Sequence, residues 1–261
     1  MKALFGLLIM FSSIFCYASL EDDLVQAAAL NDKTKVIELL DLGVSADCND
    51  GFYTPLIRAV HYSNDDIISL LIDRGAKPNF SDPHTRTPMD WAIQGREFHI
   101  MVYLHQSGAD LNLLSERRSL LQVAINSLRD ANDRDQVEFQ HKAYFWLFAN
   151  GFELKKDQAT LINTLSTALS YGDLYLLQDL FQKGDFKSKT NDYDMTGSPP
   201  LVTLMFGRQN EEELIKMAKF LVSQQADPNK PDDQGGFALG AARYMGLKKM
   251  VKYLESIGAR E

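Results

Sequence analysis

The side chains best suited to chemistry are five histidines and two cysteines. A zinc site needs Cys and His ligands at short, fixed spacings, and a zinc protease needs a His-Glu-x-x-His helix. Neither pattern occurs around the histidines, which are His61, His84, His99, His105 and His141. We therefore expect no metal, no cofactor and no catalytic residue, and we predict that the chain is not an enzyme.

One acidic segment begins like a calcium-binding loop. Asp192, Asp194 and Gly197 stand at the spacing of an EF-hand loop, in which a bidentate Glu completes the set of ligands. Thr203 occupies the place of that Glu. Because the ligand that binds calcium most strongly is missing, we do not expect this loop to bind calcium tightly.

Residues 1–18 have the order of features found in a secretory signal peptide. Lys2 precedes an apolar run over residues 3–11, and Cys16 and Ala18 are the small residues before the expected cleavage point. We expect cleavage after Ala18 and export to the periplasm, with secretion as the alternative. Cys48 would then be the single cysteine of the mature chain, so no intramolecular disulfide is expected.

The composition is that of a globular protein, with 45% hydrophobic and 24% charged residues in a chain of 261. A formal net charge of −8 argues against nucleic acid as the partner. No segment after residue 18 is an apolar run long enough to cross a membrane, so we expect no membrane span in the mature chain. The charge favours a partner protein with a basic surface, and we expect a monomer that binds it in a 1:1 complex.

A Leu-Leu-x-x-Gly pattern and its variants recur along the chain. The intervals between successive copies are 32, 33, 43, 33, 41 and 33 residues. Four intervals equal one repeat, and the two longer ones equal one repeat plus an insertion. Glycine suits the end of each copy because it adopts the left-handed conformation that closes a helix. The copies begin at Leu39, Leu71, Leu104, Leu147, Leu180, Leu221 and Leu254.

Two further motifs mark the repeats. Thr54-Pro55-Leu56 and Thr87-Pro88-Met89 each place a capping Thr and a first-turn Pro at the start of a short helix, and Gly108-Ala109-Asp110 is typical of a repeat ending. These residues resemble the ankyrin repeat, whose pattern is Thr-Pro-Leu-His-x-Ala with a Gly-Ala-Asp ending. The resemblance implies an all-α solenoid of about seven helix-turn-helix units joined by short turns or hairpins. Because Ile57 and Asp90 replace the His, it also implies that hydrogen bonds between neighbouring repeats are partly missing.

We expect a signal peptide over residues 1–18 and an ankyrin-repeat domain over residues 19–261. Large side chains at helical spacing are expected in the core, namely Trp91, Phe145, Trp146, Met245 and Met250. The repeats are expected at about residues 20–48, 49–81, 82–113, 114–156, 157–190, 191–231 and 232–261.

In proteins that resemble ankyrin arrays, partners contact the tips of the turns and the inner face of the first helix of each repeat. Tyr, Phe and Arg beside carboxylates are typical of binding hot spots. By position, the expected partner-binding residues are Asn49, Asp50, Phe52, Tyr53, His61, Tyr62, Asp82, His84, Arg86, Gln94, Arg117, Arg118, Tyr171, Asp232, Asp233, Gln234 and Tyr244.

Two charged insertions interrupt the period, at residues 126–140 and 207–213. Insertions in a solenoid lie on one face and are often functional. Charge-rich segments also serve as helix extensions that face water. The sequence leaves both interpretations open.

The export signal and the repeats together predict an exported, protein-binding scaffold that resembles exported bacterial ankyrin-repeat proteins. The resemblance implies an immunity protein that neutralises a secreted antibacterial effector in the periplasm. It also allows a periplasmic accessory protein that supports an oxidative-stress enzyme. An enzyme that uses the concave groove is a third interpretation.

Overall fold

A computed structural model describes residues 20–115, 118–127, 133–154 and 158–261. The expected signal peptide therefore lies outside the described residues. The chain divides into two compact parts, which we call the N-terminal part (residues 1–120) and the C-terminal part (residues 121–261). Each is considered by itself.

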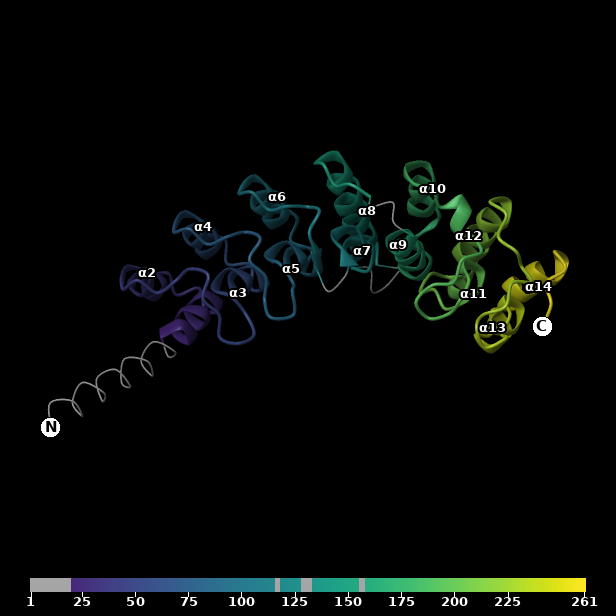
Figure 1. Cartoon of the computed structure of the whole chain (residues 1–261), viewed down its shortest axis with the longest axis horizontal. Coiled ribbons are helices and arrows are strands. Elements are labelled where there is room, and N and C mark those ends of the chain that lie inside the picture. The colour runs from purple at the N-terminus through teal and green to yellow at the C-terminus, as the bar shows by residue number, and fades with distance from the viewer. Residues whose placement is uncertain (1–19, 116–117, 128–132, 155–157) are drawn as a thin grey trace, which may run out of the picture. The chain divides into compact units, whose positions relative to one another are not determined.

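The N-terminal part consists of paired helices joined by turns. In Figure 1, α2, α4 and α6 form one row, while a helix over residues 20–29, α3 and α5 form the other. The first helices pack on one another, α3 on α5, and each packs on the second helix of its own pair. The elements are α2 (Lys33–Asp41), α3 (Pro55–His61), α4 (Asp65–Asp73), α5 (Pro88–Gly95), α6 (Phe98–Gln106), β1 (Leu114–Ser115) and β2 (Arg118–Ser119), the last two being antiparallel.

The C-terminal part repeats this arrangement, and α8, α9, α10 and α12 are each longer than any of α2 to α6. Packing runs from α9 to α11 to α13 among the first helices and from α10 to α12 to α14 among the second. The elements are α7 (Leu120–Ile125), α8 (Arg134–Ala149), α9 (Gln158–Tyr171), α10 (Leu174–Lys183), the 3-10 turn η1 (Lys187–Lys189), α11 (Pro200–Met205), α12 (Glu211–Ser223), α13 (Ala238–Tyr244) and α14 (Lys248–Ser256). Both parts are all-α arrays of helix pairs, so the predicted fold class is confirmed.

The local signals of the sequence explain where the helices begin and end. The Thr54 side chain accepts a hydrogen bond from Ile57 N at 3.1 Å, and Pro55 opens α3. Thr87 and Asp90 form a reciprocal capping box at α5. Gly108 has a φ of +96° in the turn after α6, whereas Gln225 holds a φ of +74° at the corresponding position after α12. Gln225 is therefore strained where the other repeats carry glycine.

The core follows the Leu-Leu-x-x-Gly period. The first Leu of all seven copies is fully buried, which shows that the period marks the packing face of the second helices. Of the large side chains expected in the core, Met250 is fully buried, while Trp91, Phe145 and Trp146 are half-buried. The expectation for Met245 is wrong, because the buried stripe of α13 ends at Ala242 and Met245 caps the helix with 44% exposure.

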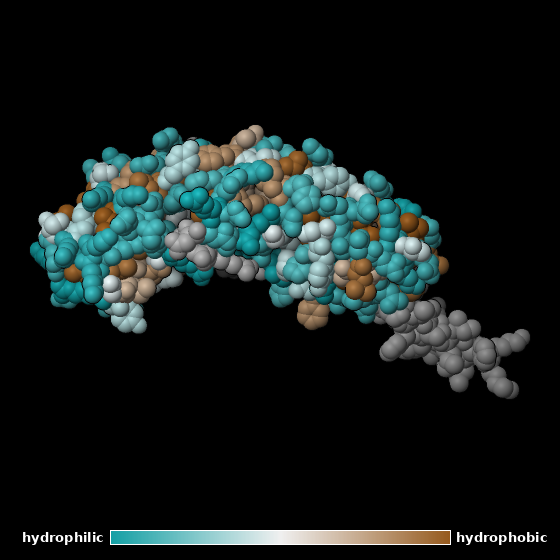
Figure 2. All heavy atoms as spheres, turned by 180° about the vertical axis from the view of Figure 1, so that it is seen from behind, coloured by the Kyte–Doolittle hydropathy of each residue, from teal (hydrophilic) through white to brown (hydrophobic). Residues whose placement is uncertain are grey.

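The surface is mainly hydrophilic, and apolar side chains form separate patches on the face drawn in Figure 2. Asparagines at repeat ends supply hydrogen bonds between neighbouring turns. Asn79 Nδ2 donates to Gly108 O at 3.1 Å, and Asn79 Oδ1 accepts from Asp110 N at 2.8 Å. Asn191 and Asn229 make the same pair of bonds to the repeats that follow them.

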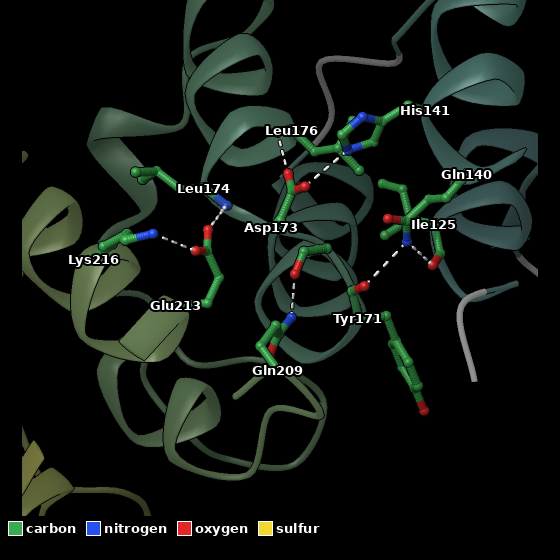
Figure 3. Close-up of polar contacts among 11 residues, drawn as sticks. Ile125, Gln140, His141, Tyr171, Asp173, Leu174, Leu176, Gln209, Glu213 and Lys216 are labelled. Carbon is green, nitrogen blue, oxygen red and sulfur yellow. Dashed lines mark hydrogen bonds and ion pairs between the residues drawn. The ribbon is translucent and has the colours of Figure 1, made fainter. Parts of the chain in front are cut away.

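The two insertions lengthen the second helices of their repeats. Residues 134–140 form the start of α8 and residues 211–213 the start of α12, so these portions extend helices. Residues 207–210 form the turn before α12, and residues 128–132 lie outside the described residues. Their side chains also bond to neighbouring helix pairs (Figure 3). Gln140 Nε2 donates to Tyr171 O at 3.0 Å, Glu213 Oε1 accepts from Leu174 N at 2.9 Å, and Gln209 Nε2 donates to the Gly172 carbonyl. These contacts are structural, because they hold one helix pair against the next.

Candidate functional site

The expected partner-binding residues of the second repeat lie in and beside one turn of the N-terminal part. Asp50 Oδ1 accepts hydrogen bonds from Phe52 N at 2.9 Å and Tyr53 N at 2.7 Å, and Asn49 Oδ1 accepts from Gly51 N at 3.0 Å. Asn49 and Asp50 therefore shape the turn. Phe52 lies at the tip of this turn and is 63% exposed, so it is available to a partner.

Asp82 does not belong to the contact surface, which corrects the sequence-based expectation. It is 3% exposed, and its carboxylate accepts hydrogen bonds from Arg86 N at 2.9 Å, from Arg86 Nε at 3.0 Å and from Trp91 Nε1 at 3.4 Å. A buried carboxylate needs such partners to offset its lost hydration. Asp82 thus positions Arg86 and Trp91, which themselves reach the surface.

The side chains that converge in this region form what we call the aromatic–arginine cluster: Tyr53, Arg58, His61, Arg86 and Trp91. The Arg58 guanidinium lies 3.9 Å from the Tyr53 ring centroid, and that of Arg86 lies 4.3 Å from the Trp91 centroid. The Trp91 ring makes edge contacts with Tyr53 at 5.6 Å and with His61 at 4.8 Å between centroids. Such stacks hold the rings in fixed positions.

Charge in the cluster is only partly compensated. Arg58 is 3.9 Å from Asp50, and its buried Nε has no hydrogen-bond partner in the described ranges. Burial lowers the pKa of His61, and the positive charges of Arg58 and Arg86 lower it further. The lowered pKa favours the neutral form of His61, which offers a ring nitrogen and an aromatic face. Exposed Tyr62 extends the surface, with its ring 4.9 Å from that of His61.

The remaining expected residues are distributed over both parts. His84 and Gln94 are exposed, and Arg118 is half-buried in β2, whereas Arg117 lies outside the described residues. Tyr171, in the C-terminal part, is half-buried with the Arg208 guanidinium 4.8 Å from its ring centroid.

The last group of expected residues lies in the C-terminal part, where two of them, Asp232 and Tyr244, line a groove. Asp232 Oδ1 accepts hydrogen bonds from Gln234 N at 3.0 Å and Gly236 N at 2.6 Å, and Asp233 accepts from the Gln234 side chain at 3.3 Å. Tyr244 is 84% exposed on α13, and Phe206, which follows α11, is 50% exposed. Both line a groove of about 210 Å³ between α11 and α13.

Sequence reasoning did not place three residues at the surface, namely Arg58, Trp91 and Phe206. Arg58 and Trp91 stand 33 residues apart, at the same repeat position. Phe206 lies six residues after the first residue of α11, as His61 does in α3 and Tyr244 in α13. Comparing equivalent positions would have found Phe206, because His61 and Tyr244 were predicted, but it would not have found Arg58 or Trp91.

Catalytic chemistry has little support in the part of the chain that the structure describes. No group of three or more His, Cys, Asp or Glu side chains there is placed to hold a metal ion. Burial, with the charge of Glu21, raises the pKa of the Cys48 thiol to about 12, so the thiol stays protonated and is a poor nucleophile. No helix among the described residues is long and apolar enough to span a membrane.

Comparison with known proteins identifies the repeat. Residues 24–115 match the family model described as ankyrin repeats (3 copies). The chain is 25% identical to alpha-latrotoxin-Lt1a of Latrodectus tredecimguttatus over 202 residues, which cover 76% of this chain and 14% of the toxin. It is 31% identical to cyclin-dependent kinase inhibitor 2A of Monodelphis domestica over 93 residues, which cover 35% of this chain and 54% of that protein.

A third relative, ankyrin repeat, SAM and basic leucine zipper domain-containing protein 1 of Equus caballus, is 37% identical over 78 residues. Those residues cover 29% of this chain and 16% of that protein. The chain thus spans between 14% and 54% of the length of these relatives.

Proposed function

We propose that the chain is an exported inhibitor, because residues 24–115 match ankyrin repeats, which indicate a protein-binding scaffold, and the described residues form an all-α array of helix pairs. In this proposal, residues 19–261 form the ankyrin-repeat domain, which neutralises a secreted antibacterial effector in the periplasm. Binding in a 1:1 complex covers the active site of the effector. The chain itself carries out no reaction.

The observation that carries the proposal is the aromatic–arginine cluster. Trp, Tyr and Arg dominate the residues whose removal costs most at protein interfaces. Here the guanidiniums of Arg58 and Arg86 lie over Tyr53 and Trp91. The carboxylate of Asp82 accepts a hydrogen bond from Arg86 Nε and so fixes its position. A surface fixed before binding loses little side-chain entropy when a partner docks, and this favours the tight binding that an inhibitor needs.

Sequence features support the exported location and the nature of the partner. The order of charged, apolar and small residues over residues 1–18 is that of a signal peptide. Cys48 is buried and is the single cysteine after residue 18, so the proposed mature chain would form no intramolecular disulfide in an oxidising compartment. The net charge of −8 favours an effector whose surface is basic overall.

A survival assay tests the proposal. The full chain is expressed in bacteria that direct to their own periplasm the secreted effector encoded beside its gene. We expect wild type to restore growth, and Trp91→Ala to restore it far less at equal periplasmic abundance. Leu8→Arg, which interrupts the apolar run of residues 3–11, should abolish both export and protection.

Control variants and the neighbouring genes make the result decisive. Asp73→Ala, an exposed change at the end of α4, should protect as wild type does. Cells that die equally with and without the exported chain contradict the inhibitor proposal. If the chain instead binds and supports a periplasmic oxidative-stress enzyme encoded beside it, the accessory role replaces inhibition.

A further inference from the structure

The groove between α11 and α13 has the chemistry of a binding site for a cationic side chain. We propose that it receives an arginine side chain of the protein partner, between the aromatic rings of Phe206 and Tyr244 and beside the carboxylate of Asp232. This inference rests on the proposed protein-binding function and specifies one contact of that function. We call the site the α11/α13 groove, and its other lining residues include Phe237, Gly240 and Ala241.

The size of the groove fits one long side chain. Its volume is about 210 Å³, and the exposed rings of Tyr244 and Phe206 line it. Gly240 lies inside α13, and a Cβ atom added there would meet nothing within 4 Å. Glycine inside a helix costs about 1 kcal/mol relative to alanine. Here the glycine keeps the space above α13 open.

One oxygen of Asp232 is available at the edge of this space. Oδ1 holds the turn through Gln234 N and Gly236 N, whereas Oδ2 has no hydrogen-bond partner within residues 158–261. Oδ2 lies against Gly236, which also lines the groove, and would be 2.7 Å from a Cβ at that position. Exposed Asp233 adds a second negative charge to the same turn. A partner that covered this carboxylate with apolar atoms would leave it desolvated and unpaired.

Basic side chains of the chain itself do not occupy the site. The eight lining residues, all within the described ranges, include no Lys or Arg. Arg243 bonds to Glu255 at 2.8 Å and to Glu261, and Lys230 lies 4.7 Å from the Tyr193 ring centroid. The carboxylate of Asp232 is therefore available to pair with a cationic side chain of a partner protein.

Arginine matches this arrangement better than lysine does. A guanidinium is planar, stacks on aromatic faces and donates hydrogen bonds from its edge to a carboxylate. The groove is lined by the aromatic side chains of Phe206 and Tyr244 and by Asp232, so it supplies both kinds of contact. An acidic side chain would be repelled by Asp232 and Asp233, so the charge selects against it.

The probe is the capped peptide acetyl-Gly-Ser-Arg-Ser-Gly-amide, titrated into the full chain with amide NMR detection. The matched control peptide carries citrulline, which keeps the shape of arginine and removes its charge. We expect the arginine peptide to shift the amide signals of Gly236, Gly240 and Ala241, and the citrulline peptide to bind at least tenfold more weakly. Equal binding of the two peptides, or shifts that leave these three amides unchanged, would overturn the proposal.

Two variants separate binding from folding. Gly240→Leu fills the groove while improving helix propensity, so binding should fall at least tenfold while the melting temperature rises. Asp232→Asn retains the oxygen that accepts from Gln234 N and Gly236 N but loses the charge, and it should also weaken binding tenfold. A Gly240→Leu variant that folds and still binds the arginine peptide as wild type does refutes the site.

Failure of this inference is distinguishable from failure of the proposed function. If the Gly240→Leu chain protects cells as wild type does and wild type does not bind the arginine peptide, the groove proposal is wrong and the inhibitor proposal stands. If wild type binds the peptide at the groove but gives no protection, the inhibitor proposal fails and the arginine site stands.

Discussion

Replacing Asp82 with alanine should destabilise the N-terminal part far more than replacing an exposed carboxylate. Removing one partner of a buried ion pair costs about 3–5 kcal/mol, because the other charge stays buried and unpaired. Arg86 keeps 19% side-chain exposure, so water can hydrate part of its guanidinium. We therefore expect a loss below that range, about 2–3 kcal/mol in the free energy of unfolding. Asp82→Asn keeps an acceptor for Arg86 N and should lose about 1 kcal/mol.

Urea unfolding followed by tryptophan fluorescence measures this loss. The chain has two tryptophans, so a Trp146→Phe background leaves Trp91, which contacts Asp82, as the reporter. Asp73→Ala is the matched control and should change the free energy by less than about 0.5 kcal/mol. In an Arg86→Met background, the cost of Asp82→Ala should shrink by about 1 kcal/mol or more. An Asp82→Ala loss equal to that of Asp73→Ala would refute the structural role assigned to Asp82.

Three further outcomes follow from local geometry. Gln225→Gly should raise the free energy of unfolding by about 1 kcal/mol, because glycine adopts the positive φ at that position without strain. Gly108→Gln should lower the free energy of unfolding, and a change of the same sign in both variants would contradict this reasoning. The folded state lowers the pKa of His61, through burial and then the charges of Arg58 and Arg86. Wild-type stability should therefore fall as pH drops below about 6.5, and His61→Gln should remove part of that fall; identical pH profiles would count against it. In a Cys16→Ala chain, buried Cys48 should react with a thiol reagent only after urea is added, so a fast reaction in native buffer would refute its burial.

Much of the fold could be predicted because its signals are local or periodic. The Leu-Leu-x-x-Gly period marks the leucines that the structure buries, and Thr-Pro marks the starts of α3 and α5. The asparagine bonds between repeat ends could not be predicted with the same ease. Asn79 meets partners 29 and 31 residues away, and nothing in its local sequence specifies that distance.

The candidate site was predictable by region but not by the role of each residue. Position in the repeat placed Tyr53, His61 and Arg86 near the surface, as the structure does. The same reasoning placed Asp82 there, although Asp82 is buried and accepts three hydrogen bonds from Arg86 and Trp91. Whether a polar side chain in a turn faces water or the chain depends on its partners, here Arg86 of the same turn and Trp91 of α5. A single sequence does not reveal those partners.

The most direct test of protein binding through the aromatic–arginine cluster is isothermal titration of the effector into the full chain, comparing wild type with Trp91→Ala. We predict one effector per chain and a loss of about 2 kcal/mol, or roughly thirtyfold in Kd, for the variant. Circular dichroism should show that both proteins are folded at the temperature used. Equal affinities of wild type and a folded Trp91→Ala variant would contradict binding through this cluster.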